Sequence, residues 1–181
     1  MKQAPTLETE RLILRPLELS DAHDVQTLAG EREIAACTRS IPHPYKDGVA
    51  EEWIEQLQPK LERGEQLSFA IVTCAATLIG SIGLVIHREN ANAELGYWIG
   101  KPYWGQGYCS EAASAIVVYG FDTLRLHRIF AHHLTRNPAS GRILQKIGMR
   151  HEGCHRQHVR KWGVFEDIEV YGLLRSEYAG A

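Results

Sequence analysis

The chain has 181 residues, with 20 lysines and arginines against 22 aspartates and glutamates, so its formal net charge is −2 at pH 7. This balance lacks the positive charge of a nucleic-acid-binding surface, and no stretch approaches the roughly 18 consecutive apolar residues of a membrane span. The length predicts a single domain over residues 1–181, which buries on the order of 70% of its unfolded surface.

The four cysteines are scattered along the chain without a CxxC pair. This usage is typical of reduced thiols rather than of a disulfide framework. The N-terminal stretch 1–6 contains no apolar signal core. We therefore expect a cytoplasmic protein, either a monomer or a homodimer.

The first part of the chain predicts one strand and then a short helix. Residues 10–17 have a strand pattern that stops near Pro16, and Ser20-Asp21 is expected to cap a helix that runs to about Gly30. Residues 35–46 are expected to be irregular.

A second helix is expected after Asp47, which we assign as its N-cap. Pro59 should kink this helix or break off its last turn, because proline has no N–H to donate. Arg63-Gly64 ends it. Its apolar residues recur at helical spacing: Val49, Trp53, Ile54, Leu57 and Leu61.

Three strand-like runs follow, joined by short polar turns that predict an antiparallel meander. These runs are 67–74, 78–87 and 92–99. A helix over about 108–122 then leads to a strand over 128–134. A strand, a helix and a strand in this order imply a right-handed parallel crossover.

The C-terminal part predicts one helix and a hairpin. Asn137-Pro138 is a strong helix start, and Gly148 suits the position just after the helix end. Two strands, about 149–160 and 165–174, are expected to join near Trp162-Gly163.

The stretch 104–110 carries the chemistry. It lies between a strand and a helix, and its two glycines let the backbone approach an anion at the helix N-terminus. We interpret it as a pyrophosphate cradle, although a plain tight turn has the same pattern. No Gly-Lys-Ser/Thr follows, which argues against a nucleotide-hydrolysing phosphate loop.

The whole element order resembles the GNAT superfamily of acetyl-CoA-dependent N-acetyltransferases, and nearest within it the RimJ/RimL-like branch that acetylates ribosomal proteins. The resemblance implies an α/β (α+β) fold with a mixed seven-stranded sheet flanked by about four helices. The matching pieces, in order, are Thr9–Arg15, Ala93–Ile99, Tyr103–Tyr108 with Ser110–Ala112, Asn137–Ser140 and Leu144–Met149.

The resemblance implies acetyl-CoA as the co-substrate and no metal. Trp104 stands where the family usually has a basic or amide residue, and Cys109 where it has glycine or alanine. The residues that it implies for acetyl-CoA binding are Tyr97, Trp98, Ile99, Trp104, Gly105, Gln106, Gly107, Tyr108, Cys109, Ser110, Asn137 and Ser140.

Two catalytic roles follow from the resemblance. Glu94 is the candidate base, directly or through water; the alternative is a solvated carboxylate on the strand. Many members carry a tyrosine in the last helix as the acid for the leaving thiolate, but here Leu144 occupies that place. Ser140, one turn earlier, is the substitute, unless it only satisfies the backbone of the first turn.

The expected reaction is direct attack of a primary amine on the thioester. A lysine amine, with a pKa near 10.4, is almost wholly charged at pH 7, whereas about a tenth of an α-amine is neutral. The predicted acceptor is the N-terminal α-amine of a ribosomal protein, in a pocket walled by His43, Tyr45 and Trp53. A small amine (a polyamine or an aminoglycoside) and a non-catalytic acyl-CoA-binding module remain as alternatives.

Two other patterns are given ordinary interpretations. His151, His155 and His158 do not share one face of a strand, so we expect them to be surface or turn residues rather than metal ligands. Cys109 at a helix N-terminus would have a lowered pKa, but no base and orienting group accompany it as a nucleophile requires.

Overall fold

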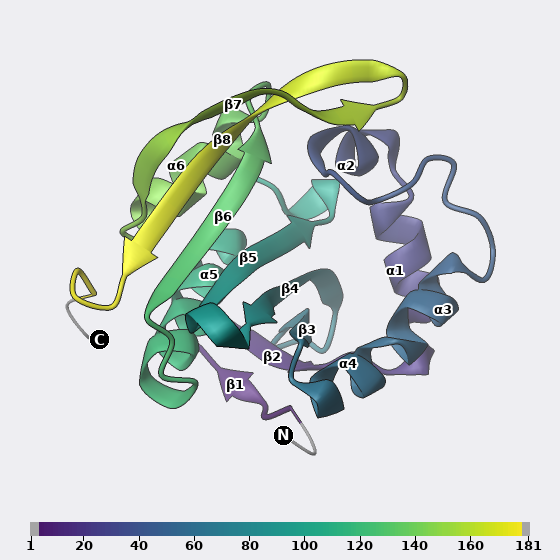
Figure 1. Ribbon diagram of the computed structural model, residues 1–181. Coiled ribbons are helices and arrows are strands. Elements are labelled where there is room, and N and C mark those ends of the chain that lie inside the picture. The colour runs from purple at the N-terminus through teal and green to yellow at the C-terminus, as the bar shows by residue number, and fades with distance from the viewer. Residues whose placement is uncertain (1–3, 179–181) are drawn as a thin grey trace.

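The computed structural model describes residues 4–178, so part of the N-terminal stretch 1–6 lies outside the described residues. A mixed sheet of eight strands, in the order β1-β2-β3-β4-β5-β6-β8-β7, runs through the protein (Figure 1). The strands are β1 Leu7–Glu8, β2 Leu12–Pro16, β3 Gln66–Thr73, β4 Leu78–His87, β5 Asn92–Ile99, β6 Arg128–Leu134, β7 Arg150–Lys161 and β8 Val164–Leu174.

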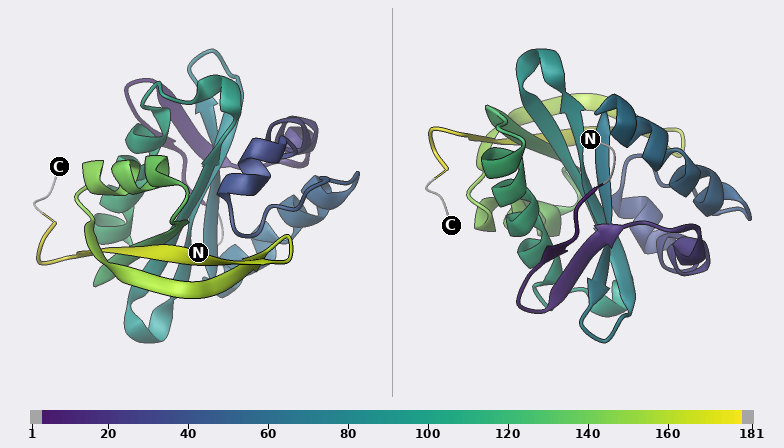
Figure 2. Two further views of the ribbon diagram at one scale, coloured as in Figure 1. Left: turned by 90° about the horizontal axis from the view of Figure 1, so that it is seen from above. Right: turned by 90° about the horizontal axis from the view of Figure 1, so that it is seen from below.

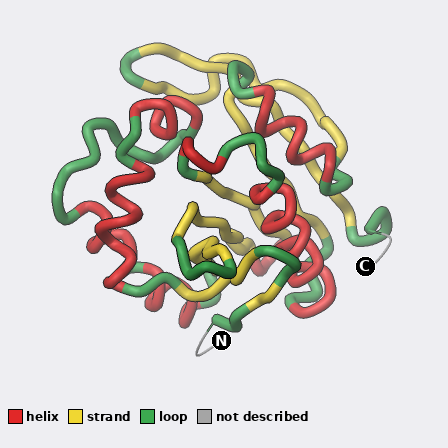
Figure 3. Tube along the Cα trace, turned by 180° about the vertical axis from the view of Figure 1, so that it is seen from behind, coloured by secondary structure: helices red, strands yellow, loops and turns green. Residues whose placement is uncertain are grey.

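Helices cover both faces of the sheet, with α5 and α6 on one side and α1 to α4 on the other (Figure 2). Seen from behind, the strands lie between the two sets of helices (Figure 3). The α-helices of the described chain are α1 Ala22–Ala29, α2 Arg32–Cys37, α3 Val49–Glu55, α4 Leu57–Arg63, α5 Tyr108–Val118 and α6 Pro138–Lys146.

The predicted strand order is confirmed in its main part. Strands β2 to β5 form the antiparallel meander, and β5 pairs in parallel with β6 after the crossover through α5. The bounds of β4, β5 and β6 are those predicted. The final hairpin turns at Trp162-Gly163, where both residues have positive φ (48° and 84°) and so match the twist of the flanking strands.

The sheet has one strand more than the seven predicted. The extra strand, β1, has two residues, which pair with Ile13 and Leu14 of β2 at the edge of the sheet. Two residues are too few to give a readable alternation of apolar and polar side chains.

The N-terminal helices also differ from the prediction of about four helices in all. Helix α2 extends into the stretch 35–46 that was expected to be irregular; burial of Ile34 and Ala35 holds it, and no side chain caps it. The assignment of Asp47 as an N-cap was wrong. Helix α3 begins after Gly48, at φ +85°, and the Asp47 carboxylate accepts a hydrogen bond from Gln26 Nε2 at 2.8 Å.

The helix predicted from Asp47 to Gly64 is divided at Gln56 into α3 and α4. This division places Pro59 in the first turn of α4, where its missing N–H leaves no intrahelical bond unmade. The helix is therefore broken just before the proline, at Gln56, into two short helices.

Two apolar clusters fix the sheet between its helices. Because successive strand residues point to opposite faces, β5 contributes Leu95 to the cluster under α5 and α6 and Trp98 to the cluster under α1 and α3. The alternation also directs Glu94 to the α1–α4 side and Tyr97 to the α5–α6 side.

The start and end of α6 are as predicted. The Asn137 side chain accepts a hydrogen bond from the Ser140 N–H at 3.3 Å, and Pro138 is the first helical residue. Gly148 has φ +86°, a conformation that favours glycine after a helix end.

We predict that Asn137→Ala lowers the free energy of unfolding by about 1 kcal/mol, because the Ser140 N–H loses its capping acceptor. Urea denaturation measures this change. Asn90→Ala is the matched control, since Asn90 is exposed in a short turn. An equal effect of the two variants would contradict the capping role.

Candidate functional site

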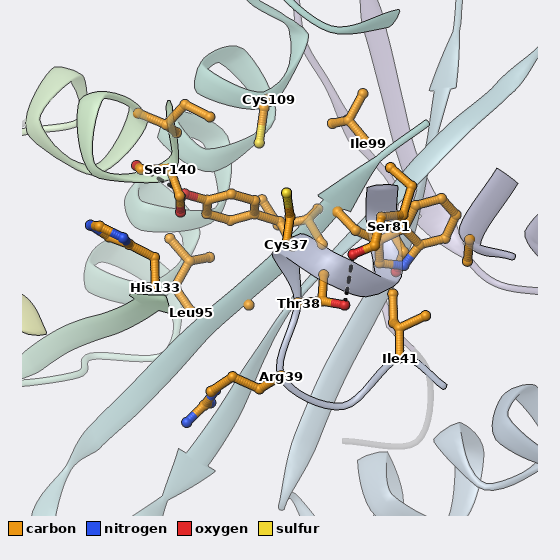
Figure 4. Close-up of a pocket in the computed structure, with 18 of the residues that line it drawn as sticks. Cys37, Thr38, Arg39, Ile41, Ser81, Leu95, Ile99, Cys109, His133 and Ser140 are labelled. Atoms are coloured by element: carbon orange, nitrogen blue, oxygen red, sulfur yellow. Dashed lines mark hydrogen bonds between the residues drawn. The ribbon is translucent and has the colours of Figure 1, made fainter. Parts of the chain in front are cut away.

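The parallel strands β5 and β6 diverge after a short paired segment. Strand β5 pairs with β4 along its whole length, but with β6 only over Asn92–Glu94. A cavity of about 710 Å³ lies where they separate and extends from α5 and α6 on one face to the segment after α2 on the other. In Figure 4, Ser140 and His133 lie on one side of this cavity and Thr38 and Ile41 on the other.

The open edge of β5 presents backbone donors to the gap. Gly100 donates its N–H to the Ile79 carbonyl of β4 at 2.8 Å. Because successive residues of a strand point their N–H groups to opposite neighbours, the N–H groups of Ile99 and Tyr97 face away from β4, into the gap. By the same rule, the N–H of Trp98 faces β4, and its side chain lies on the α1–α3 side.

The glycine loop forms an open cradle at the N-terminus of α5. Gly105 and Gly107 have φ of 74° and 83°, and nothing lies within 4 Å of a Cβ built on Gly105. Glu111 donates its N–H to the Gly107 carbonyl at 3.1 Å, and the first-turn donors before it have no intrahelical acceptor. Such a helix start is suited to bind a phosphate group.

Arg11, which lies between β1 and β2, and Glu111 of α5 hold this loop in place. The Arg11 guanidinium donates to the Glu111 carboxylate at 2.7 Å and to the Gln106 carbonyl at 3.0 Å. Thr9 also donates to Glu111, at 2.7 Å. Residues some 100 positions apart in the chain thus hold the loop, and their spacing in the sequence gave no sign of the contact.

Two loop side chains do not point to the cradle. The Trp104 indole donates its N–H to the Ile99 carbonyl at 2.6 Å and so attaches the loop to the end of β5. The Gln106 side chain is exposed, donates to the Pro102 carbonyl at 3.0 Å, and is absent from the cavity lining. The Gln106 side chain therefore does not reach the cavity.

Ser140 meets a phenol from the opposite wall. The hydroxyl oxygens of Tyr97 and Ser140 are 2.8 Å apart, while Leu144 is buried in the core. Burial raises the pKa of Tyr97, so the phenol stays protonated and can donate to Ser140 Oγ. In that arrangement the Ser140 hydrogen is free to point into the cavity.

The expectation of a lowered pKa for Cys109 was wrong. Although Cys109 lies in the first turn of α5, burial raises the pKa of its thiol. A neutral thiol at this place packs against the core cluster under α5 and α6.

Glu94 lies on the other face, in a small charged group. Its carboxylate forms an ion pair with Arg39 and accepts a contact of 3.2 Å from Nδ1 of His132 on β6. Burial alone would raise the pKa of Glu94, but the His132 hydrogen bond and the Arg39 charge outweigh it, so the pKa lies below its ordinary value. The carboxylate is therefore ionised at neutral pH.

Of the three predicted acceptor residues, the structure brings two to the cavity. Tyr45 and Trp53 both line it. His43 does not: it is exposed, its Nδ1 lies 3.2 Å from the Gly30 carbonyl, and its ring faces Trp162 at 6.3 Å. The rigid prolines on both sides of His43 gave no indication of this direction.

Sequence reasoning missed several charged or titratable residues of the lining. Arg39 and His132 contact Glu94, and Arg142 and Lys146 bring two positive charges from α6 to the edge of the cavity. The helical period places Arg142 and Lys146 on one face of α6, which is the one signal that could have revealed them.

No group of three or more histidine, cysteine, aspartate or glutamate side chains within residues 4–178 is arranged to hold a metal ion. Over the same residues, no helix combines the length and the apolar character that a membrane crossing needs.

A sheet opened between two parallel strands, with a phosphate-binding helix start beside the opening, defines an acyltransferase that uses a coenzyme A thioester. The chain belongs to the GNAT acetyltransferases: residues 11–150 match the family described as Acetyltransferase (GNAT) domain. It is an acetyl-CoA-dependent acetyltransferase.

Similar proteins cover nearly the whole chain. The uncharacterized N-acetyltransferase p20 of Bacillus licheniformis is 33% identical over 178 residues, which are 97% of this chain and 99% of p20. The crystal structure of a GNAT-family acetyltransferase from Bacillus anthracis aligns with a TM-score of 0.84 at 25% identity, over 96% of this chain and all of that chain.

The name of a third relative states the amine that it acetylates. The spermidine N(1)-acetyltransferase of Vibrio cholerae is 26% identical over 169 residues, or 93% of this chain and 95% of that protein.

We predict that Gly105→Val weakens the binding of coenzyme A by roughly ten-fold, because a β-branched residue at φ +74° costs about 1–2 kcal/mol and distorts the cradle. Isothermal titration calorimetry with coenzyme A measures the effect. Gly163→Val is the matched control: it has φ +84°, nothing within 4 Å of its Cβ, and a place at the distant hairpin turn. Equal affinities of the two variants would contradict the cradle.

Proposed function

We propose that this enzyme transfers the acetyl group of acetyl-CoA to the N-terminal α-amine of a protein, most closely a ribosomal protein, by direct attack within a single domain. The observation that carries this proposal is the pairing of the Glu94 carboxylate. It is the one carboxylate in the described lining of the cavity, and Arg39 and His132 already engage it.

A single paired carboxylate favours an acceptor with one amine. A polyamine carries several ammonium groups, each of which needs a carboxylate or water when it leaves bulk solvent. The cavity lining instead includes neutral polar and aromatic side chains, among them Gln66, Ser68, Tyr45 and Trp53.

The basicity of Glu94 favours an α-amine. Because its pKa is below the ordinary value, the carboxylate is a weak base. A weak base suffices for an α-amine, of which about a tenth is neutral at pH 7, but not for an amine with a pKa near 10.

Other groups around the cavity are suited to bind the coenzyme and to protonate the leaving sulfur. The outward N–H groups of Tyr97 and Ile99 can hold the thioester arm and its developing oxyanion, and the loop 104–110 with Asn137 can hold the rest of the coenzyme. Ser140, accepting from Tyr97, can donate its own hydrogen to the leaving sulfur. The amine loses one proton toward Glu94 and the thiolate gains one, so the transfer is balanced.

Acceptor identity is tested by mass spectrometry after incubation with acetyl-CoA. The panel contains a peptide with a free N-terminus, the same peptide with a blocked N-terminus and one lysine, spermidine, and an aminoglycoside. We predict acetylation of the free N-terminus above all others. Preferred acetylation of a small amine would support that alternative, and bound coenzyme A with no thiol release from any amine would support a binding module.

Glu94→Gln is predicted to lower kcat by about 10²–10⁴-fold, as for loss of a general base, with little change in the affinity for coenzyme A. Ser140→Ala is predicted to lower kcat by about 10–100-fold, as for loss of a hydrogen bond to a charged group. Stopped assays of thiol release and calorimetry measure the two quantities. Glu89→Gln, at an exposed turn, is the control.

Tyr97→Phe tests the arrangement around Ser140. It should lower kcat in the wild-type background and have no further effect in Ser140→Ala, because the two hydroxyls act in one chain of hydrogen bonds. Additive losses would contradict this chain.

A further inference from the structure

Arg39 places a positive charge beside the point at which the acceptor amine must arrive. It follows α2, and its guanidinium forms an ion pair with the Glu94 carboxylate on β5. Figure 4 shows the Arg39 side chain at the edge of the cavity, below Thr38. Apart from lowering the pKa of Glu94, this arginine has no role in the transfer steps proposed above.

The backbone on both sides of Arg39 is held in place. The Cys37 carbonyl accepts a hydrogen bond from Asn137 Nδ2 at 3.4 Å, and the Ile41 carbonyl accepts one from Lys161 Nζ at 2.9 Å. These anchors come from α6 and from the β7–β8 hairpin. The backbone that carries the charge is thus held by two separate parts of the fold.

We propose that Arg39 is a specificity-determining residue, whose charge disfavours acceptors with two or more ammonium groups and so selects a single α-amine. The inference rests on the proposed function and names the residue that restricts its acceptor class.

Repulsion is the first reason. The described cavity lining contains no second carboxylate for another ammonium group, while Arg39 adds a like charge next to the single carboxylate that it does contain. At the effective dielectric of a partly exposed site, one such charge changes a binding constant by about ten-fold.

The second reason concerns the proton on the amine. A nearby cation favours the neutral form of an amine and so lowers its pKa. A modest decrease makes an α-amine mostly neutral near pH 7, whereas a polyamine nitrogen with a pKa near 10 stays charged. His132 on β6 also contacts Glu94, and the ring of His155 on β7 lies 6.4 Å from the His132 ring, measured between centroids.

The test compares kcat/KM for spermidine and for an uncharged peptide with a free N-terminus. In Arg39→Gln, the ratio of spermidine to peptide should rise by about ten-fold. Arg39→Lys keeps the charge and should keep the wild-type ratio. Arg63→Gln, which removes an exposed arginine paired with Glu65, is the matched control.

Two further measurements separate charge from structure. With the peptide, the rise of kcat with pH should move to higher pH in Arg39→Gln, because the bound amine loses its cationic neighbour. Putrescine should bind the coenzyme A complex about ten-fold more tightly in Arg39→Gln than in wild type, as measured by calorimetry.

The outcomes distinguish this inference from the proposed function. An unchanged ratio and an unchanged pH profile in Arg39→Gln overturn the inference while α-amine transfer stands. Tighter putrescine binding in Arg39→Gln, without acetylation of any peptide, supports the charge effect and overturns the proposed function. A wild-type enzyme that prefers spermidine overturns both.

Discussion

The separation of β5 from β6 is the constraint on which the rest of the site depends. Unpaired backbone groups inside a protein cost free energy, so a sheet opens in its middle only where something else provides partners. Here side chains link the two sides of the opening. His132 on β6 contacts Glu94 on β5 at the last paired position, and Tyr97 on β5 contacts Ser140 on α6. The N–H groups of Tyr97 and Ile99 face the gap beyond this paired segment.

The alternation of apolar and polar residues made the central strands predictable, because β4, β5 and β6 are long and buried on at least one face. The glycine loop and the Asn137-Pro138 helix start were predictable from local backbone chemistry. By contrast, β1 and α2 are too short to show a periodic pattern of apolar residues in the sequence. The ion pairs Arg11–Glu111 and Arg39–Glu94 join residues that are far apart in the chain. Such contacts form only when the sheet is folded, so no local sequence pattern predicts them.

Asn137 connects the two halves of the cavity. Its carbonyl oxygen caps α6 beside Ser140, and its amide nitrogen reaches the Cys37 carbonyl at the end of α2. A single side chain therefore contacts both the start of α6 and the segment that leads to Arg39. This shared amide group links the wall formed by α6 to the wall formed by the segment after α2.

Helix α6 has a leucine, Leu144, at the position where the family resemblance implies a tyrosine. Leu144 is buried against the sheet at the position where the family resemblance implies a phenol, so a polar group there would lack a partner. The phenol comes instead from Tyr97 on β5 and meets α6 one turn earlier, at Ser140. Burial raises the pKa of Tyr97 and keeps the phenol protonated, and either hydroxyl of the pair can donate to the other. Tyr97 and Ser140 thus bring two hydrogen-bonded hydroxyls to the cavity, where the family resemblance implies one phenol.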